Sequence, residues 1–158
     1  MFRERSHKRE LTEFGDLFLP EEADEPILGA GVRAALMEWL TEIWADKELK
    51  AVGIKARRRA IYDGPPGCGK TTLAHHLAAR LGLPMLAVRP DRIIDKYVGQ
   101  TGQNIGDLFE AARDQLNGSP VLLFIDEFDA IAGKRRKAEQ AADNGRNEAV
   151  NTLMQRLE

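Results

Sequence analysis

Residues 64–71 of this chain read Gly64-Pro65-Pro66-Gly67-Cys68-Gly69-Lys70-Thr71. This run matches the pattern G-x-x-x-x-G-K-[ST] of a loop that binds the phosphates of a nucleoside triphosphate. Because glycine has no Cβ, such a loop can turn its backbone N–H groups onto an anion. The pattern predicts that Lys70 binds the β- and γ-phosphates and that the Thr71 hydroxyl ligates Mg²⁺. We therefore expect residues 64–71, together with Thr72, to bind ATP, and Lys70 also to act in catalysis.

The residues on either side of this loop favour the same interpretation. Before the loop, Ala60-Ile61-Tyr62 is a short apolar run that predicts a buried strand. After the loop, apolar residues recur at helical spacing as far as Gly82, which predicts a helix that ends there. The apolar residues of that helix are Leu73, Ala74, Leu77, Ala78 and Leu81. A strand, a glycine-rich loop and a helix in this order are the setting in which a phosphate-binding loop is found.

A second candidate site follows an unbroken apolar run. Residues 121–125, Val-Leu-Leu-Phe-Ile, predict a central strand buried on both faces, and Asp126 and Glu127 follow directly. Acidic residues are unfavourable next to a core unless a cation or a reaction requires them. We therefore expect Asp126 to hold Mg²⁺ and Glu127 to act as the base for an attacking water.

The remaining periodicity completes an α/β pattern. Residues 31–50 and the stripe from Ile105 to Leu116 have helical spacing, residues 84–88 read as a strand, and a helix restarts near Asn147. The resulting β-α-β-α-β order predicts a parallel sheet with helices on both faces. The fold class is therefore α/β, that of a P-loop NTPase with a three-layer αβα arrangement, and the family resemblance given next implies that this sandwich is incomplete.

These motifs together resemble one family. Residues 64–71 resemble the Walker A motif of the AAA-family ATPases, and residues 122–135 resemble the Walker B strand with its following helix. The run from Arg58 to Glu158 resembles the first two-thirds of the nucleotide-binding core of that family.

The resemblance implies further site residues and partners. Lys96, Tyr97, Val98 and Gly99 resemble the loop that lines the central pore of AAA unfoldases, where an aromatic residue grips a protein substrate. Pro26-Ile27-Leu28-Gly29 resembles the segment that packs on the adenine, so Leu28 and Gly29 are expected to bind ATP. The family also implies a homo-oligomer, a hexamer in the full protein. The chain ends before the family's sensor strand and arginine fingers, so we expect it to be a fragment of a longer protein with weak activity on its own.

Composition limits the other possibilities. The chain has 158 residues, a net charge of −2 and a single cysteine, Cys68, so it predicts one domain with no internal disulfide. No apolar run approaches the length of about 18 residues that a membrane span requires. Together with the single cysteine, this favours a cytoplasmic protein. Residues 1–25 are rich in charge and are interpreted as a solvated linker that precedes a core at 26–158.

Two other functions remain open at this point. A P-loop kinase would use the same loop but would need a pocket for an acceptor. An ATP-dependent loading factor for nucleic acid would share both Walker motifs, and the four cations Lys134, Arg135, Arg136 and Lys137 could contact an acidic partner. Kinases of this type seldom combine a central strand with a terminal Asp-Glu pair, and loading factors that resemble this family generally lack the aromatic-hydrophobic-glycine loop that contains Tyr97.

Overall fold

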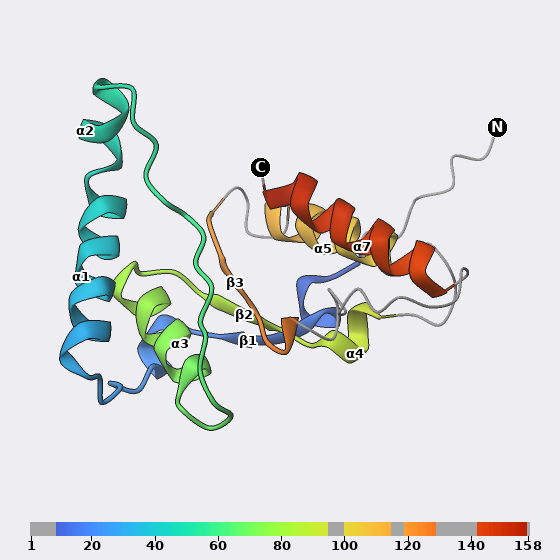
Figure 1. The fold of residues 1–158 in the computed structure, drawn as a ribbon, viewed down its shortest axis with the longest axis horizontal. Coiled ribbons are helices and arrows are strands. Elements are labelled where there is room, and N and C mark those ends of the chain that lie inside the picture. The colour runs from blue at the N-terminus through green and yellow to red at the C-terminus, as the bar shows by residue number, and fades with distance from the viewer. Residues whose placement is uncertain (1–8, 95–99, 115–118, 129–141, 158) are drawn as a thin grey trace. The chain divides into compact units, whose positions relative to one another are not determined.

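The structure of the chain, a computed structural model, describes residues 9–94, 100–114, 119–128 and 142–157. The chain divides into two compact units, which are described separately (Figure 1). The first unit comprises the residues up to Leu17 and those from Leu86 onward, and the second comprises Phe18–Met85. Among the described residues, no helix has the length and apolar character needed to cross a bilayer.

A three-stranded sheet has the order β1-β2-β3. The central strand β2 (Met85–Val88) and its neighbour β3 (Leu122–Ile125) confirm the strands expected at 84–88 and 121–125. Every residue of β3 is only half-buried, so the expectation of a strand buried on both faces was wrong. The apolar run predicts a strand, but how many layers cover that strand depends on parts of the fold distant in sequence.

The strand β1 (Gly15–Phe18) lies where the sequence predicted a solvated linker, and the structure corrects that interpretation. Leu11 and Phe14 precede this strand and are 3% and 0% exposed. The backbone N–H of Arg89 donates to the carbonyl of Phe14 at 2.9 Å, next to β2. The many charged residues of this segment led to the prediction of a linker, although its two apolar side chains, Leu11 and Phe14, are buried in the core. The predicted core of 26–158 therefore omits Leu11 and Phe14, which belong to the apolar core.

Glycine at position 15 is required by the close approach of β1 to β2. A Cβ built on Gly15 would lie 2.1 Å from the carbonyl oxygen of Ala87 and 2.9 Å from the Cα of Val88. Both neighbours are backbone atoms, which cannot rotate away as a flexible side chain can. Only a residue without a Cβ lets the two strands lie this close together.

In the first unit, helices pack on this sheet around one apolar core. The short helices are η1 (Leu11–Glu13) and α4 (Pro90–Ile93), and the long helices are α5 (Gln100–Asp114) and α7 (Ala142–Leu157). Figure 1 shows α5 and α7 side by side, in gold and red. The predicted apolar stripe of α5 is confirmed, and α7 starts at Ala142, earlier than the predicted restart. The buried residues of this core are Leu11, Phe14, Leu86, Val88, Ile93, Ile105, Leu108, Ala111 and Leu153.

The second unit contains η2 (Pro20–Glu22), α1 (Ala30–Trp44), α2 (Asp46–Ala51) and α3 (Lys70–Arg80). The helix predicted at 31–50 is therefore confirmed, with a break at Ala45. The indole Nε1 of Trp39 donates to the carbonyl of Arg57 at 2.6 Å, and the Arg57 Nε donates to a Glu42 oxygen at 2.6 Å. These contacts fasten the segment that leads to the glycine-rich loop onto α1.

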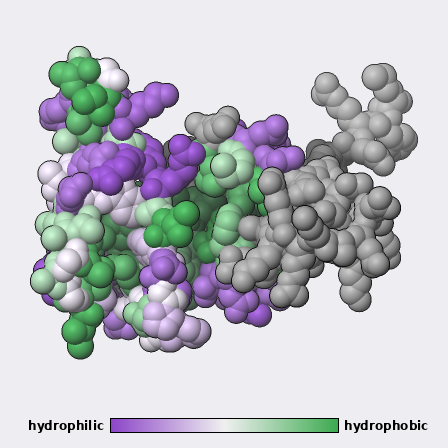
Figure 2. Space-filling model, in the orientation of Figure 1, coloured by the Kyte–Doolittle hydropathy of each residue, from purple (hydrophilic) through white to green (hydrophobic). Residues whose placement is uncertain are grey.

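The strand predicted at Ala60-Ile61-Tyr62 was wrong. Residues 54–65 have no regular secondary structure, and Ile61 is 95% exposed. Figure 2 shows other apolar side chains at the surface near the tip formed by α2, where Val52 is 71% exposed. A strand needs a hydrogen-bonded neighbour, and a three-residue apolar run cannot supply one by itself. In the described sheet, the strand next to β2 on the side away from β3 is β1.

Candidate functional site

The glycine-rich loop ends in left-handed backbone at two of its glycines. Gly67 has φ 75° and Gly69 has φ 87°, in the region that residues with a Cβ rarely adopt. Gly69 is the N-cap of α3, and its carbonyl accepts the first helical hydrogen bond from Leu73 N–H at 2.9 Å. The chain therefore reverses tightly and enters α3 within three residues of Gly67.

The side chain of Lys70 folds back over this loop. Its ammonium donates to the carbonyls of Gly64 at 2.9 Å and Pro65 at 3.0 Å, and lies 3.8 Å from the Cys68 sulfur. A cation held only by neutral carbonyls at an exposed site can exchange them for phosphate oxygens, which are charged and stronger acceptors. This arrangement suits the phosphate-binding role predicted for Lys70.

Thr71 and Thr72 lie in the first turn of α3, where both are exposed. The backbone N–H groups of a first turn have no partner within the helix, and the helix dipole places partial positive charge there. The loop, the Lys70 ammonium and this helix end together form a concentration of donors suited to an anion. Tyr62 lies just before the loop, and burial raises the pKa of its phenol to about 12, so it stays protonated at neutral pH.

Two contacts position α3 from its buried side. Ala74, Leu77 and Ala78 are at most 1% exposed. The buried His75 places Nε2 at 2.7 Å from the carbonyl of Leu19, and its ring centroid lies 5.3 Å from that of Phe18. His75 is therefore a packing residue, and the sequence gave no indication of its partners near β1.

The helix ends as predicted at Gly82. That residue has φ 67°, and the N–H of Leu83 donates to the carbonyl of Ala78 at 2.9 Å. A left-handed glycine with this bond terminates many helices.

Leu28 and Gly29 lie in the second unit, as does the glycine-rich loop. Leu28 is half-buried, and Gly29 is the N-cap of α1, with its carbonyl accepting from Arg33 N–H at 3.0 Å. Their contact with adenine stays a prediction.

Asp126 and Glu127 follow β3 directly, and both are exposed. Glu127 has φ 48°, in the left-handed region, and its N–H donates to the Asp126 Oδ1 at 2.9 Å. A left-handed conformation costs a residue with a side chain about 1–2 kcal/mol. Strain of this kind persists mostly at functional sites, where it aims a side chain that would otherwise point elsewhere. The sequence pattern located this acidic pair but gave no indication of the left-handed backbone at Glu127.

The predicted Mg²⁺ ligands belong to different units, Thr71 to the second and Asp126 to the first. A hydroxyl and a carboxylate are the hard oxygen donors that Mg²⁺ prefers, and protein sites for this ion commonly supply only one or two carboxylates beside phosphate and water. Each of the two residues is therefore of a type that can ligate Mg²⁺, and their shared site stays a prediction. In the part of the chain that the structure describes, no three acidic, His or Cys side chains gather as a metal cluster.

The predicted substrate loop, Lys96 to Gly99, lies outside the described residues, between Ile94 and Gln100. The four cations at 134–137 also lie outside them. Both interpretations stay predictions.

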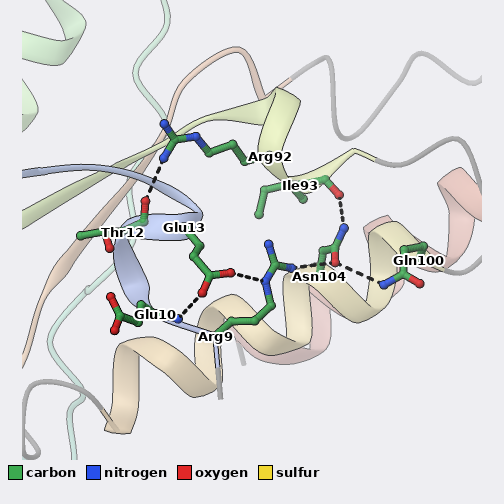
Figure 3. Close-up of polar contacts among 8 residues, drawn as sticks. All are labelled: Arg9, Glu10, Thr12, Glu13, Arg92, Ile93, Gln100 and Asn104. Atoms are coloured by element: carbon green, nitrogen blue, oxygen red, sulfur yellow. Dashed lines mark hydrogen bonds and ion pairs between the residues drawn. The ribbon is translucent and has the colours of Figure 1, made fainter. Parts of the chain in front are cut away.

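Sequence reasoning missed Asn104, a residue of α5 that is 7% exposed. Its side chain bonds to Arg9 and to the carbonyl of Ile93, as Figure 3 shows. Its one signal was a polar residue in line with Leu108 and Ala111 on the apolar face of that helix.

Comparison with known proteins matches the site to one family. A sequence model of the "ATPase family associated with various cellular activities (AAA)" matches residues 61–158. The chain is 40% identical over 128 residues to an uncharacterized AAA family ATPase, y4kL, of Sinorhizobium fredii. It is 42% identical over 106 residues to the 26S proteasome regulatory subunit 10B of Dictyostelium discoideum. It is 30% identical over 145 residues to the ATP-dependent zinc metalloprotease FtsH of Lancefieldella parvula.

These matches cover most of this chain but a minor part of each relative. They cover 81%, 67% and 92% of the chain and 37%, 25% and 20% of the three relatives, in the same order. The chain thus spans well under half the length of the relatives it matches.

Proposed function

Because the chain belongs to the AAA family of ATPases, we propose that it binds ATP with Mg²⁺ and hydrolyses it to remodel or thread a protein substrate. The fold class, an incomplete P-loop α/β domain, agrees with this family. The whole protein is proposed to work in the cytoplasm as a homo-oligomer, a hexamer.

The observation that carries the proposal is the geometry of residues 64–70. Left-handed glycines at 67 and 69, the start of α3 at Lys70 and an ammonium resting on loop carbonyls together form an anion site with a mobile cation. This combination is typical of a phosphate-binding loop, whereas an ordinary turn does not require it.

The hydrolytic step is assigned to the second motif. Glu127 accepts a proton from the attacking water, and its left-handed backbone at the end of β3 sets the direction in which its side chain leaves the chain. Thr71 and Asp126 would hold Mg²⁺, which supplies charge neutralisation for the phosphates when bound. Lys70 binds the phosphates and stabilises the charge that develops on them.

Two lines of support point to a protein substrate. The relatives include a regulatory subunit of the 26S proteasome and an ATP-dependent metalloprotease, and another relative, 36% identical over 106 residues, is a peroxisomal ATPase, PEX6, of Arthrobotrys oligospora. The chain also carries Tyr97 in the position where the family's pore loop falls, between β2 and α5.

The test uses the whole protein with three test variants and one control variant. Lys70→Ala should abolish ATP binding, whereas Glu127→Gln should retain binding and lose hydrolysis. Lys47→Ala is the control, because Lys47 is an exposed cation on α2 in the same unit. Tyr97→Ala should keep basal hydrolysis and lose stimulation by an unfolded polypeptide. Transfer of the γ-phosphate to an acceptor, or hydrolysis that survives Glu127→Gln, would contradict the proposal.

A further inference from the structure

The segment that carries the chain from α2 into the glycine-rich loop is held by side chains of α1. Residues 54–65 have no regular secondary structure, as the coil between α2 and α3 in Figure 1 shows. The backbone groups of such a segment bond either to water or to other elements. At Arg57 both groups bond to α1, because its N–H donates to Glu42 Oε1 at 2.8 Å and its carbonyl accepts from Trp39 Nε1 at 2.6 Å. The helix therefore supplies the partners that a neighbouring strand would supply in a sheet.

The side chain of Arg57 adds to these backbone bonds. Its Nε donates to Glu42 Oε2 at 2.6 Å, and its Nη2 donates to Glu38 Oε1 at 2.9 Å. The Arg57 backbone N–H and then its guanidinium lower the pKa of the Glu42 carboxyl, which is therefore ionised at neutral pH. One exposed ion pair contributes little, but four bonds that converge on a single residue restrict its backbone as well as its side chain. We call Glu38, Trp39, Glu42 and Arg57 the Arg57 anchor.

The anchor lies a short distance along the chain from the phosphate-binding residues. Ala56, next to Arg57, is 8% exposed, so the anchored end of the segment also packs. Tyr62 is half-buried and lies two residues before Gly64, at the other end of the segment. A segment that is fixed at one end and half-buried near the other has less conformational freedom to lose when the loop closes on a ligand.

The same helix α1 also contacts the other flank of the loop. It packs on α3, and the Arg80 guanidinium of α3 lies 6.0 Å from the ring centroid of Trp44 on α1. Helix α3 begins at Lys70, whose ammonium bonds to the carbonyls of Gly64 and Pro65 at the start of the loop. One helix therefore supports both the segment that enters the loop and the helix that leaves it.

From these contacts we propose that Arg57 is a positioning residue for the glycine-rich loop. Anchored on α1, it holds the entering segment so that residues 64–71 are preorganised for the phosphates of ATP. This inference rests on the proposed function, because it assumes that the loop binds ATP. It extends the nucleotide site to three side chains of α1 that the pattern of the loop does not include.

Three substitutions separate positioning from a contribution to stability alone. Arg57→Met removes the guanidinium bonds, and Trp39→Phe removes the donor to the Arg57 carbonyl. Lys50→Met is the matched control, because it breaks an ion pair to Asp46 within α2 and leaves the Arg57 anchor intact. The two side chains of that pair are 62% and 18% exposed, and those of Arg57 and Glu42 are 59% and 20% exposed. The two ion pairs are therefore equally screened by solvent, and they differ in what they hold.

The experiment measures amide hydrogen exchange without nucleotide, the Kd for ATP, kcat at saturating ATP and thermal unfolding, all in the whole protein. For Arg57→Met we expect faster exchange at residues 58–63, because the segment is released locally. The Kd for ATP should rise about three- to tenfold, because a smaller fraction of the protein holds the loop in its binding conformation. Trp39→Phe should raise the Kd about two- to fivefold. In both variants kcat should stay within about twofold of the wild type, and Lys50→Met should change neither exchange nor Kd.

The outcomes distinguish this inference from the proposed function. If the wild type binds ATP and Lys70→Ala abolishes binding, but Arg57→Met has the same Kd as Lys50→Met, the positioning role is overturned and the proposed function stands. Unchanged exchange at residues 58–63 in Arg57→Met would overturn it as well, because the anchor would then not hold the segment. A fall in kcat as large as the rise in Kd would also overturn it. If the wild type binds no ATP, the proposed function fails and the inference fails with it.

Discussion

Replacing Gly15 by alanine tests whether β1 is an integral strand of the core. The new Cβ would lie 2.1 Å from the Ala87 carbonyl oxygen, and real Cβ atoms essentially never approach another heavy atom closer than 3.0 Å. Strand β1 must therefore move away from β2 by about the difference between 2.1 Å and 3.0 Å, since both contacting groups of β2 are backbone atoms. That movement disrupts the 2.9 Å hydrogen bond from Arg89 N–H to the Phe14 carbonyl and shifts the buried Phe14 ring.

The magnitude follows from these two losses. The hydrogen bond contributes about 1 kcal/mol and the strain of overpacking adds about 1–3 kcal/mol, so the free energy of unfolding should fall by about 2–4 kcal/mol. For a chain of 158 residues this lowers the melting temperature by about 4–16 °C. Complete detachment of β1 would expose Leu11 and Phe14 and add about 1.5–3 kcal/mol for each.

Thermal and urea unfolding followed by circular dichroism measure the effect, with Gly31→Ala as the matched control. Gly31 lies within α1, and a Cβ there meets no atom within 4 Å. The control should therefore raise the stability by about 0.5–1 kcal/mol, because alanine favours a helix over glycine. If Gly15→Ala melts within about 1 °C of the wild type, β1 does not pair with β2 as described and the reasoning is refuted.

Three further predictions concern the second unit and the end of β3. Glu127→Gly should stabilise the fold by about 0.5–1 kcal/mol, because glycine relieves the left-handed strain, and it should lose hydrolysis. Glu127→Gln should lose hydrolysis without that gain in stability. Equal melting temperatures of these two variants would contradict the strain. His75→Phe should destabilise by about 0.5–1.5 kcal/mol in urea titrations, because the Leu19 carbonyl loses the His75 donor and keeps only the 3.2 Å bond from Glu22 N–H. His75→Gln should cost less, and the reverse order would contradict the contact. The Arg57 backbone N–H and then its guanidinium hold the pKa of the Glu42 carboxyl below its usual 4.5. The stabilisation from that depressed pKa is present above pH 4.5 and is lost as the pH falls through the folded value. The melting temperature of the wild type should therefore exceed that of Glu42→Gln by less at pH 3 than at pH 7. An unchanged difference would contradict the role of this ion pair.

Local chemistry made much of this protein predictable from its sequence. The glycine-rich loop, α3 and its end at Gly82 depend on contacts within a few residues, so the order of residues is enough to foresee them. The helices at 30–51 and 100–114 and the strands at 85–88 and 122–125 follow from apolar periodicity in the same way. The acidic pair after β3 was located by its position at the end of an apolar run.

Tertiary structure decided the features that depend on partners distant in the chain. The pairing of Gly15 with Ala87 turned a charged segment into an edge strand, and Ile61 stayed exposed in irregular structure where an apolar run had predicted a strand. The left-handed φ of Glu127 and the bonds from Asn104 to Arg9 and Ile93 likewise have no local signature. A strand or a buried amide is stable only when a partner satisfies its hydrogen bonds, and the identity of that partner is set by the folded chain as a whole.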